Sequence, residues 1–236
     1  LRKSYGDYEA VRGVSFSVHD GGVMGLLGPN GAGKTTIMKM LTGYHRPDGG
    51  VALLDGIDVD EDPLAVKARV GYLPEGVPLY LDMSVADYLD FAARARMLPR
   101  LRVKEAMDRA MEACGLSGMG PIRLEHLSKG YRQRVGLAQA IIHDPPILIL
   151  DEPTTGLDPN QILEIRSLIR SLGEKKTVIL STHILQEVEA LCSSVIILNE
   201  GQVAAQGSPA QIAESLKGED RIECVLAHGV PESAVD

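Results

Sequence analysis

The sequence of 236 residues contains no tryptophan, two phenylalanines and three cysteines. Cys114, Cys192 and Cys224 are far apart and show no CxxC spacing, which argues against a disulfide framework or a zinc site, so we expect buried or free thiols. No apolar run approaches the about 18 residues of a membrane span, and there is no charged-then-apolar leader. We therefore expect a cytosolic chain, and we interpret its start at Leu1 rather than Met as that of a trimmed fragment.

The sequence also lacks an excess of basic residues. It has 24 lysines and arginines against 32 aspartates and glutamates, a formal net charge of −8. Because binding to a nucleic-acid backbone depends on clustered lysine and arginine, this charge argues against a general nucleic-acid surface, although it does not exclude a local one. We expect no nucleic-acid partner. The 44% of hydrophobic and 24% of charged residues are typical of a globular protein with a substantial core, in one large domain or two small ones.

The most specific pattern is a glycine-rich stretch that fits GxxxxGK[ST]. It follows the apolar run 23–27 and precedes the helix-compatible run 37–41, so strand, loop and helix come in the order of a phosphate-binding loop. Inward backbone N–H groups and a helix N-terminus favour a polyphosphate there. Lys34 is expected to bridge the β- and γ-phosphates, and the Thr35 hydroxyl to hold Mg²⁺. The residues expected to contact the nucleotide are Gly28, Pro29, Asn30, Gly31, Ala32, Gly33, Lys34, Thr35 and Thr36.

The other patterns indicate alternating strands and helices with a helical insertion. Alternation, apolar runs and turn signals predict strands over 14–18, 51–54, 70–73, 147–150, 177–181, 195–198 and 202–205. Helical spacing and end signals predict helices over about 84–98, 102–114, 135–142, 162–172 and 208–218. Because two of these helices interrupt the strand–helix alternation, we expect a helical subdomain between about 76 and 145.

Two acidic residues follow the predicted strand 147–150, which has the continuous apolar character of a parallel strand buried on both faces. Open α/β sheets bind ligands at the C-terminal ends of such strands. Asp151 suits Mg²⁺ as a direct or indirect partner, and Glu152 is placed to activate a water for attack on the γ-phosphate. The alternative interpretation is a pair of acids that cap the next helix. His183 follows the strand 177–181 at the same sheet edge, so we predict a γ-phosphate contact, although a lone histidine is usually structural.

The order of these motifs resembles that of the ATP-binding subunits of ABC transporters, from Tyr5 to about Gly218. Such proteins have a phosphate loop, a glutamine loop, an LSGGQ-like signature, a strand ending in Asp-Glu, a D-loop and a switch histidine. The matching positions are 28–36, Glu75, 127–131, 147–152, 156–158 and His183. The resemblance implies an α/β fold: a phosphate-loop NTPase core with a mainly parallel sheet, an N-terminal antiparallel β subdomain and an inserted α-helical subdomain. We expect one ATPase domain over 1–218 and a C-terminal extension over 219–236.

The resemblance also implies a head-to-tail dimer of two ATPase subunits, a homodimer in the ATP state, with ATP between one subunit's phosphate loop and the other's signature. Ser128 and the N–H of Gly130 would reach the γ-phosphate across this interface, and Asp158 would couple the two sites. Tyr5 has the position of the adenine-stacking aromatic, whereas its place in the sequence alone also fits a residue covering the sheet edge. The implied catalytic residues are Glu152, His183 and Lys34, and the implied Mg²⁺ ligands are Thr35, Glu75 and Asp151. The implied partners are transmembrane permease subunits at the inner face of the cell membrane.

Two motifs depart from the family pattern. Glu75 stands where a glutamine is usual, and its carboxylate would repel the γ-phosphate when no metal is bound, so we expect unusually Mg²⁺-dependent nucleotide binding. In the signature, Lys129 replaces a glycine and Tyr131 replaces the glutamine, whereas Ser128 and Gly130 are retained. Hydrolytic activity is therefore still expected.

The strings LSKGYRQRVGLAQA and GYLPE look most like the branch of ABC-2 type exporters and gliding-motility ATPases. This favours ATP-driven export or force transmission over import. The alternative function is a soluble ABC-family ATPase that acts as a nucleotide-gated clamp in DNA repair, translation or cofactor assembly, and a third is a regulatory module without turnover. The single short cassette and the acidic balance disfavour the clamp. The sequence does not indicate the substrate.

Overall fold

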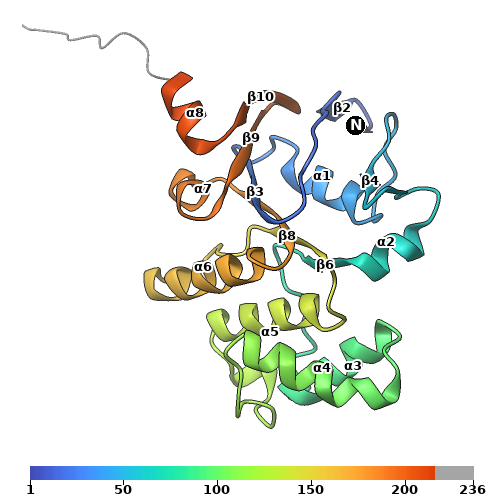
Figure 1. The fold of residues 1–236 in the computed structure, drawn as a ribbon, viewed down its shortest axis with the longest axis vertical. Helices are drawn as coiled ribbons and strands as arrows, with labels where there is room; N and C mark the ends of the chain where they lie inside the picture. The colour runs from blue at the N-terminus through green and yellow to red at the C-terminus, as the bar shows by residue number, and fades with distance from the viewer. Residues whose placement is uncertain (216–236) are drawn as a thin grey trace, which may run out of the picture.

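A six-stranded sheet organises the structure, a computed structural model that describes residues 1–215 (Figure 1). The strand order is β10–β9–β3–β8–β7–β6. The neighbouring strands run parallel except for β10, which is antiparallel to β9. The bounds are β3 Gly22–Leu27, β6 Val70–Leu73, β7 Ile147–Asp151, β8 Thr177–Thr182, β9 Ser194–Asn199 and β10 Gln202–Gly207. The expected mainly parallel sheet is thus confirmed. The predictions for Cys224, for a helix end near Gly218 and for the extension 219–236 lie outside the described residues.

The N-terminal region forms the expected antiparallel structure. The strands β1 (Arg2–Tyr5) and β2 (Tyr8–Arg12) pair with each other, and a second small ladder joins β4 (Leu53–Leu54) and β5 (Ile57–Asp58). The predicted strand over 14–18 is wrong: burial alternates along it as expected, but no described strand pairs with it, so no ladder forms. The predicted strand over 51–54 is also shorter than expected, because only its last two residues pair.

Helices cover both faces of the sheet (Figure 1). One face packs against α1 (Lys34–Leu41), with α2 (Pro63–Arg69) at the side of β6. The other packs against α5 (Lys129–Ile141), α6 (Pro159–Gly173) and α7 (Leu185–Leu191), the last of which the sequence patterns did not reveal. Two further helices, α3 (Val85–Ala95) and α4 (Arg100–Ala113), lie on the outer side of α5 at the bottom of Figure 1. The short 3₁₀-helix η1 (Leu124–His126) precedes α5, and α8 (Pro209–Ser215) ends the described chain.

The helical insertion and the sheet share one hydrophobic core. A single cluster of buried side chains contains Leu89 of α3, Val103 of α4, Leu137 of α5 and Leu150 of β7. Each buried side chain of this size contributes about 1.5–3 kcal/mol through removal of its apolar surface from water. The second cluster lies on the other face of the sheet, among β2, α1 and the alternate side chains of the strands. The helices α3 to α5 are therefore continuous with the core of the sheet.

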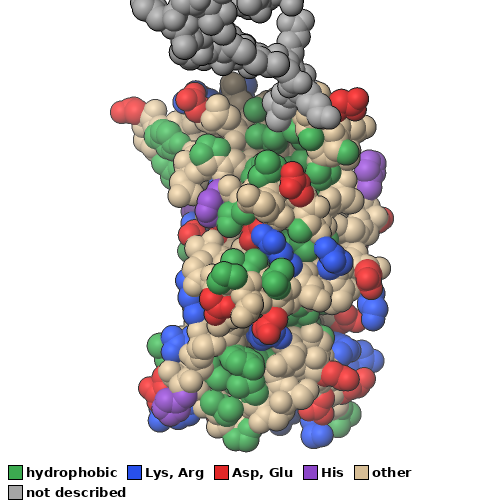
Figure 2. All heavy atoms as spheres, turned by 90° about the vertical axis from the view of Figure 1, so that its left-hand side faces the viewer, with side chains coloured by type: hydrophobic (Ala, Val, Ile, Leu, Met, Phe, Trp, Pro, Cys, Tyr) green, Lys and Arg blue, Asp and Glu red, His purple; other side chains and the backbone are tan. Residues whose placement is uncertain are grey.

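The surface carries charges of both signs, and two of the three cysteines lie in the described part of the chain. Figure 2 shows positive and negative side chains interspersed over the face seen there, with hydrophobic patches between them. Within residues 1–215, no helix combines the length and the hydropathy that crossing a bilayer requires. Cys114 and Cys192 are buried free thiols as predicted, and burial raises the pKa of each to about 12.

Candidate active site

The glycine loop between β3 and α1 has a backbone suited to bind anions. Gly31 and Gly33 adopt left-handed conformations with φ of 82° and 100°, and Gly33 is the N-cap of α1. A Cβ on Gly33 would lie 2.6 Å from the carbonyl oxygen of Ala10, so the loop leaves no room for a side chain there. Loop residues and the first turn of α1 line a cavity of about 390 Å³, and these residues are Asn30, Gly31, Gly33, Lys34, Thr35 and Thr36.

The Lys34 ammonium lies buried at this cavity and is held from two sides. It donates to the carbonyl oxygens of Gly28 at 2.7 Å and Pro29 at 3.2 Å, which keeps it over the loop. Its Nζ also lies 3.4 Å from Oε1 of Glu152. An anion that enters the loop therefore competes with Glu152 for the same cation.

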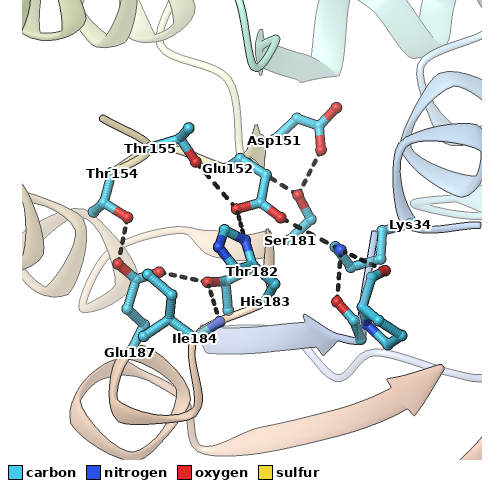
Figure 3. Close-up of polar contacts among 12 residues, drawn as sticks. Lys34, Asp151, Glu152, Thr154, Thr155, Ser181, Thr182, His183, Ile184 and Glu187 are labelled. Carbon is cyan, nitrogen blue, oxygen red and sulfur yellow. Dashed lines mark hydrogen bonds and ion pairs between the residues drawn. The ribbon is translucent and has the colours of Figure 1, made fainter. Parts of the chain in front are cut away.

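The Glu152 carboxylate connects Lys34 to the histidine of the neighbouring strand (Figure 3). Its Oε2 lies 2.9 Å from Nδ1 of His183 and accepts a hydrogen bond from Thr155 Oγ1 at 3.2 Å. Because an ionised carboxylate only accepts, the imidazole N–H donates in this pair. The register of the sheet explains the meeting, since Asp151 pairs with Ser181 and both strands end at the same edge. The sheet thus brings Lys34, Glu152 and His183 together.

The backbone at Glu152 is strained. Its φ of 48° lies in the left-handed region, which costs a non-glycine residue about 1–3 kcal/mol and is concentrated at functional sites. The Glu152 N–H is held by Ser181, donating to Oγ at 3.0 Å and to the carbonyl oxygen at 3.3 Å. This turn at the end of β7 aims the carboxylate at the cavity.

Oxygen donors suited to Mg²⁺ surround the base of the loop. Asp151 Oδ1 accepts hydrogen bonds from Ser181 Oγ at 2.5 Å and Thr35 Oγ1 at 3.3 Å, whereas its buried Oδ2 has no partner within the described residues. Burial raises the pKa of Asp151, and these two hydrogen bonds act in the opposite direction. Glu75 is exposed and lines the same cavity. Within residues 1–215, no cluster of three or more histidine, cysteine, aspartate or glutamate side chains has metal-binding geometry. A metal at this place would therefore be held by Thr35, one or two carboxylates and the phosphate oxygens of the nucleotide, as Mg²⁺ commonly is.

Two aromatic side chains stand at the cavity. Tyr5 is 44% exposed and lines the cavity, as adenine stacking requires, with its ring 5.8 Å from that of His45 in edge contact. Tyr8 lines it too and donates from its hydroxyl to the carbonyl oxygen of Gly31 at 3.0 Å. Sequence patterns did not single out Tyr8 or Thr155. Tyr8 reaches the loop from a distant part of the chain, and Thr155 contacts Glu152 from within the turn that follows it.

The signature and D-loop residues lie outside this cavity. Ser128 is the N-cap of α5, and its Oγ accepts from the N–H of Tyr131 at 3.4 Å. Asp158 is the N-cap of α6, and its Oδ1 accepts from the N–H of Gln161 at 3.0 Å. A separation from the phosphate loop of the same chain is what the resemblance implies for residues that act on the nucleotide of a second subunit. That role stays a prediction.

The segments that carry the two caps lie close to each other. A Cβ on Gly130 would lie 2.6 Å from the side chain of Gln161, and a Cβ on Gly156 would lie 2.0 Å from Nζ of Lys129. The segment 128–131 and the segment 156–161 therefore lie next to each other, in contact through the side chains of Gln161 and Lys129.

The parallel sheet, the glycine loop and the carboxylates at the strand ends define a phosphate-loop nucleotide-binding protein. Residues 11–155 match the family model described as ABC transporter. The chain is 40% identical over 214 residues to the ABC transporter ATP-binding protein NatA of Bacillus subtilis (strain 168), covering 90% of this chain and 87% of that protein. It is 38% identical over 224 residues to the Nod factor export ATP-binding protein I of Ralstonia nicotianae (strain ATCC BAA-1114 / GMI1000), covering 94% and 70%. The chain belongs to the family of ABC transporter ATP-binding proteins.

Solved structures agree with this assignment. The cbiO1 subunit of Clostridium perfringens, part of the ABC transporter complex cbiONQ, is similar with a TM-score of 0.82 and 29% identity, covering 91% of this chain and 88% of that one. An ATP-binding subunit of an ABC transporter is similar with a TM-score of 0.80 and 30% identity, covering 91% and 90%. These similarities confirm the predicted family and fold class. Members of this family bind and hydrolyse ATP.

Proposed function

We propose that this chain is the ATP-hydrolysing subunit of an ABC exporter, of the ABC-2 type. The observation that carries the proposal is the meeting of Lys34, Glu152 and His183 at one cavity behind a phosphate loop. Similarity to an export ATP-binding protein over 94% of the chain supports the direction of transport.

The residues of the cavity suit hydrolysis of the γ-phosphate. Lys34 would hold the β- and γ-phosphates, and the released Glu152 carboxylate would take a proton from the attacking water. His183 would orient Glu152 and reach the γ-phosphate. Thr35, Glu75 and Asp151 would hold Mg²⁺, which neutralises charge on the phosphates when it is bound.

The signature would act on a second subunit. Ser128 and Asp158 are exposed at the starts of α5 and α6, and Tyr131 in the first turn of α5 is 41% exposed, whereas Gly130 is buried. The exposed residues are available to meet another chain. A head-to-tail pair would place them over the partner's phosphate loop. We take the pair to be a homodimer.

A groove beside the helical insertion is our candidate surface for the permease. A cavity of about 1260 Å³ lies among the end of α1, α2, the end of α3 and α4. Three large apolar side chains of this groove are strongly exposed, Tyr44 at 73%, Leu64 at 77% and Met97 at 91%. Exposed apolar clusters of this kind commonly mark protein contacts. Such a contact would hold the subunit at the inner face of the cell membrane.

The second candidate, a soluble clamp on nucleic acid, has less support. The face shown in Figure 2 carries interspersed charges rather than a continuous basic surface. Backbone phosphate binding would require the latter.

ATP hydrolysis by the purified chain with Mg²⁺ tests the enzymatic part. We expect Glu152→Gln to lower kcat by about 10²–10⁴-fold, the usual contribution of a general base, while ATP still binds. Glu189→Gln, the same change at an exposed position of α7, is the matched control and should hydrolyse normally. Turnover that survives Glu152→Gln would show that the base is wrong.

Affinity capture from gently solubilised membranes tests the transporter part. We expect a stoichiometric partner with about six membrane spans, each about 20 apolar residues long. Leu64→Glu should release that partner without changing basal ATP hydrolysis. The clamp would be favoured instead if only soluble proteins or nucleic acid were recovered and the chain were absent from the membrane fraction.

A further inference from the structure

A buried carboxylate outside the nucleotide cavity joins the two segments that carry Glu152 and His183. Glu187 lies in the first turn of α7, is 1% exposed and does not line the cavity. Figure 3 shows it on the opposite side of His183 from Lys34. None of the motifs in the sequence analysis includes it.

The two oxygens of Glu187 accept hydrogen bonds from different segments. Oε1 accepts from the hydroxyl of Thr154, and Oε2 accepts from Thr182 Oγ1 at 2.6 Å. Thr154 comes two residues after Glu152, and Thr182 directly precedes His183. Thr182 Oγ1 also accepts from the N–H of Ile184 at 3.1 Å, so this hydroxyl is fixed on both sides of the histidine.

The ion pair of Glu187 does not account for its burial. Among residues 1–215, the cation paired with Glu187 is Arg166, whose Nη2 lies 3.7 Å from Oε1 and whose buried Nε has no hydrogen-bond partner there. A buried carboxylate is costly unless it is well paired and its oxygens are satisfied, and such groups are often replaceable by apolar residues without loss of stability. The two threonine hydroxyls therefore supply the close contacts, and those contacts are geometric constraints on the active-site segments.

We propose that Glu187 is a positioning residue that sets the distance between Glu152 and His183. By binding Thr154 and Thr182 at once, it fixes the chain just after the first and just before the second. The 2.9 Å contact between Glu152 Oε2 and His183 Nδ1 depends on both segments staying in register. The inference rests on the proposed hydrolysis at Glu152. The contacts of Glu187 are with Thr154, Thr182 and Arg166 and not with the phosphate loop, so we expect it to affect turnover more than ATP binding.

Steady-state kinetics of the full chain test this role. In Glu187→Gln the side chain keeps its shape, but it loses its charge and an NH2 donor group replaces one of the two acceptor oxygens. We expect kcat to fall about tenfold, because displacements near 1 Å at a reacting centre cost up to about 10²-fold. The ATP dissociation constant should stay within about twofold, since the contacts of Lys34 are intact. Glu189→Gln, on the same helix and exposed, should behave as wild type.

Conservative pairs at the threonines separate positioning from folding. Thr182→Ser and Thr154→Ser keep the hydroxyl and should retain kcat, whereas Thr182→Val and Thr154→Val keep the shape and should lower it. The chemical shift of the His183 imidazole, read by NMR at fixed pH without ATP, should move in Glu187→Gln and stay in Glu189→Gln.

The outcomes are distinguishable. A wild-type chain without ATP hydrolysis would defeat the proposed function, and the imidazole shift would still report on the Glu187 contacts. Wild-type kcat in Glu187→Gln, or serine variants as impaired as the valine variants, would overturn the inference alone. A parallel loss of ATP affinity and kcat would also overturn it, because that pattern is one of general misfolding.

Discussion

Replacing Glu75 by glutamine should weaken the dependence of ATP binding on Mg²⁺. Glu75 lies two residues after the end of β6 and lines the same cavity as Lys34 and Thr35. With Mg²⁺ present its carboxylate is an expected ligand. Without the metal it is a negative charge that faces the negative γ-phosphate.

The exposure of Glu75 sets the size of the effect. Two unit charges about 4 Å apart repel by about 4 kcal/mol at an effective dielectric constant near 20 and by about 1 kcal/mol in bulk water. Because Glu75 is exposed, water and salt screen the repulsion, and the lower value applies. About 1 kcal/mol corresponds to about a fivefold change in affinity. Glu75→Gln should therefore tighten metal-free ATP binding about fivefold, and it should weaken or leave unchanged binding of Mg²⁺–ATP.

The quantity to measure is the ratio of the ATP dissociation constants in EDTA and in Mg²⁺. Equilibrium titration with ATP gives both constants, in a Glu152→Gln background that prevents turnover. Glu174→Gln is the matched control, because it removes the same charge at an exposed position beyond the end of α6, next to the start of β3 and away from the cavity. If Glu75→Gln left this ratio unchanged, the reasoning would be refuted. It would also be refuted if Glu174→Gln lowered the ratio as much as Glu75→Gln does.

Three further outcomes follow from the geometry. Gly33→Ala should destabilise the chain more than Gly31→Ala in chemical denaturation, because Gly31 adds only left-handed strain of about 1–2 kcal/mol whereas a Cβ at Gly33 meets a backbone oxygen at 2.6 Å; equal losses would contradict this. Burial lowers the pKa of His143 from 6.5 to about 4, so the unfolded chain takes up a proton first as pH falls. Stability that is complete above pH 6.5 should then decline towards pH 4 by about 2 kcal/mol after allowing for partial exposure, and thermal unfolding of His143→Gln should lack this decline. Tyr5→Leu should weaken ATP binding about tenfold through lost stacking and leave tripolyphosphate binding unchanged, whereas a loss for both ligands would argue against an adenine contact.

The parts of the site that could be predicted are those encoded by neighbouring residues. The loop around Gly33 and Lys34 depends on local backbone geometry, and Glu152 and His183 each directly follow a strand that is recognisable by itself. Parallel pairing then brings the strand ends together, as the general behaviour of such sheets requires. The sequence therefore predicted which side chains share the sheet edge.

The contacts made through space could not be predicted in this way. Glu187 meets Thr154 across 33 positions of sequence, and nothing in the amphipathic spacing around α7 distinguishes a buried glutamate from an exposed one such as Glu189. Tyr8 reaches Gly31 only because β2 lies against the loop. The predicted strand over 14–18 had the correct alternation, but a strand also needs a neighbour, and alternation carries no information about pairing.

The shared core gives α5 a mechanical role. This helix packs against β6 on one side and against α3 and α4 on the other, and it begins immediately after Ser128. Protein interiors are packed as densely as organic crystals and compress little. We therefore expect a displacement of α3 or α4 to move α5 with it and to reach the signature at the start of α5.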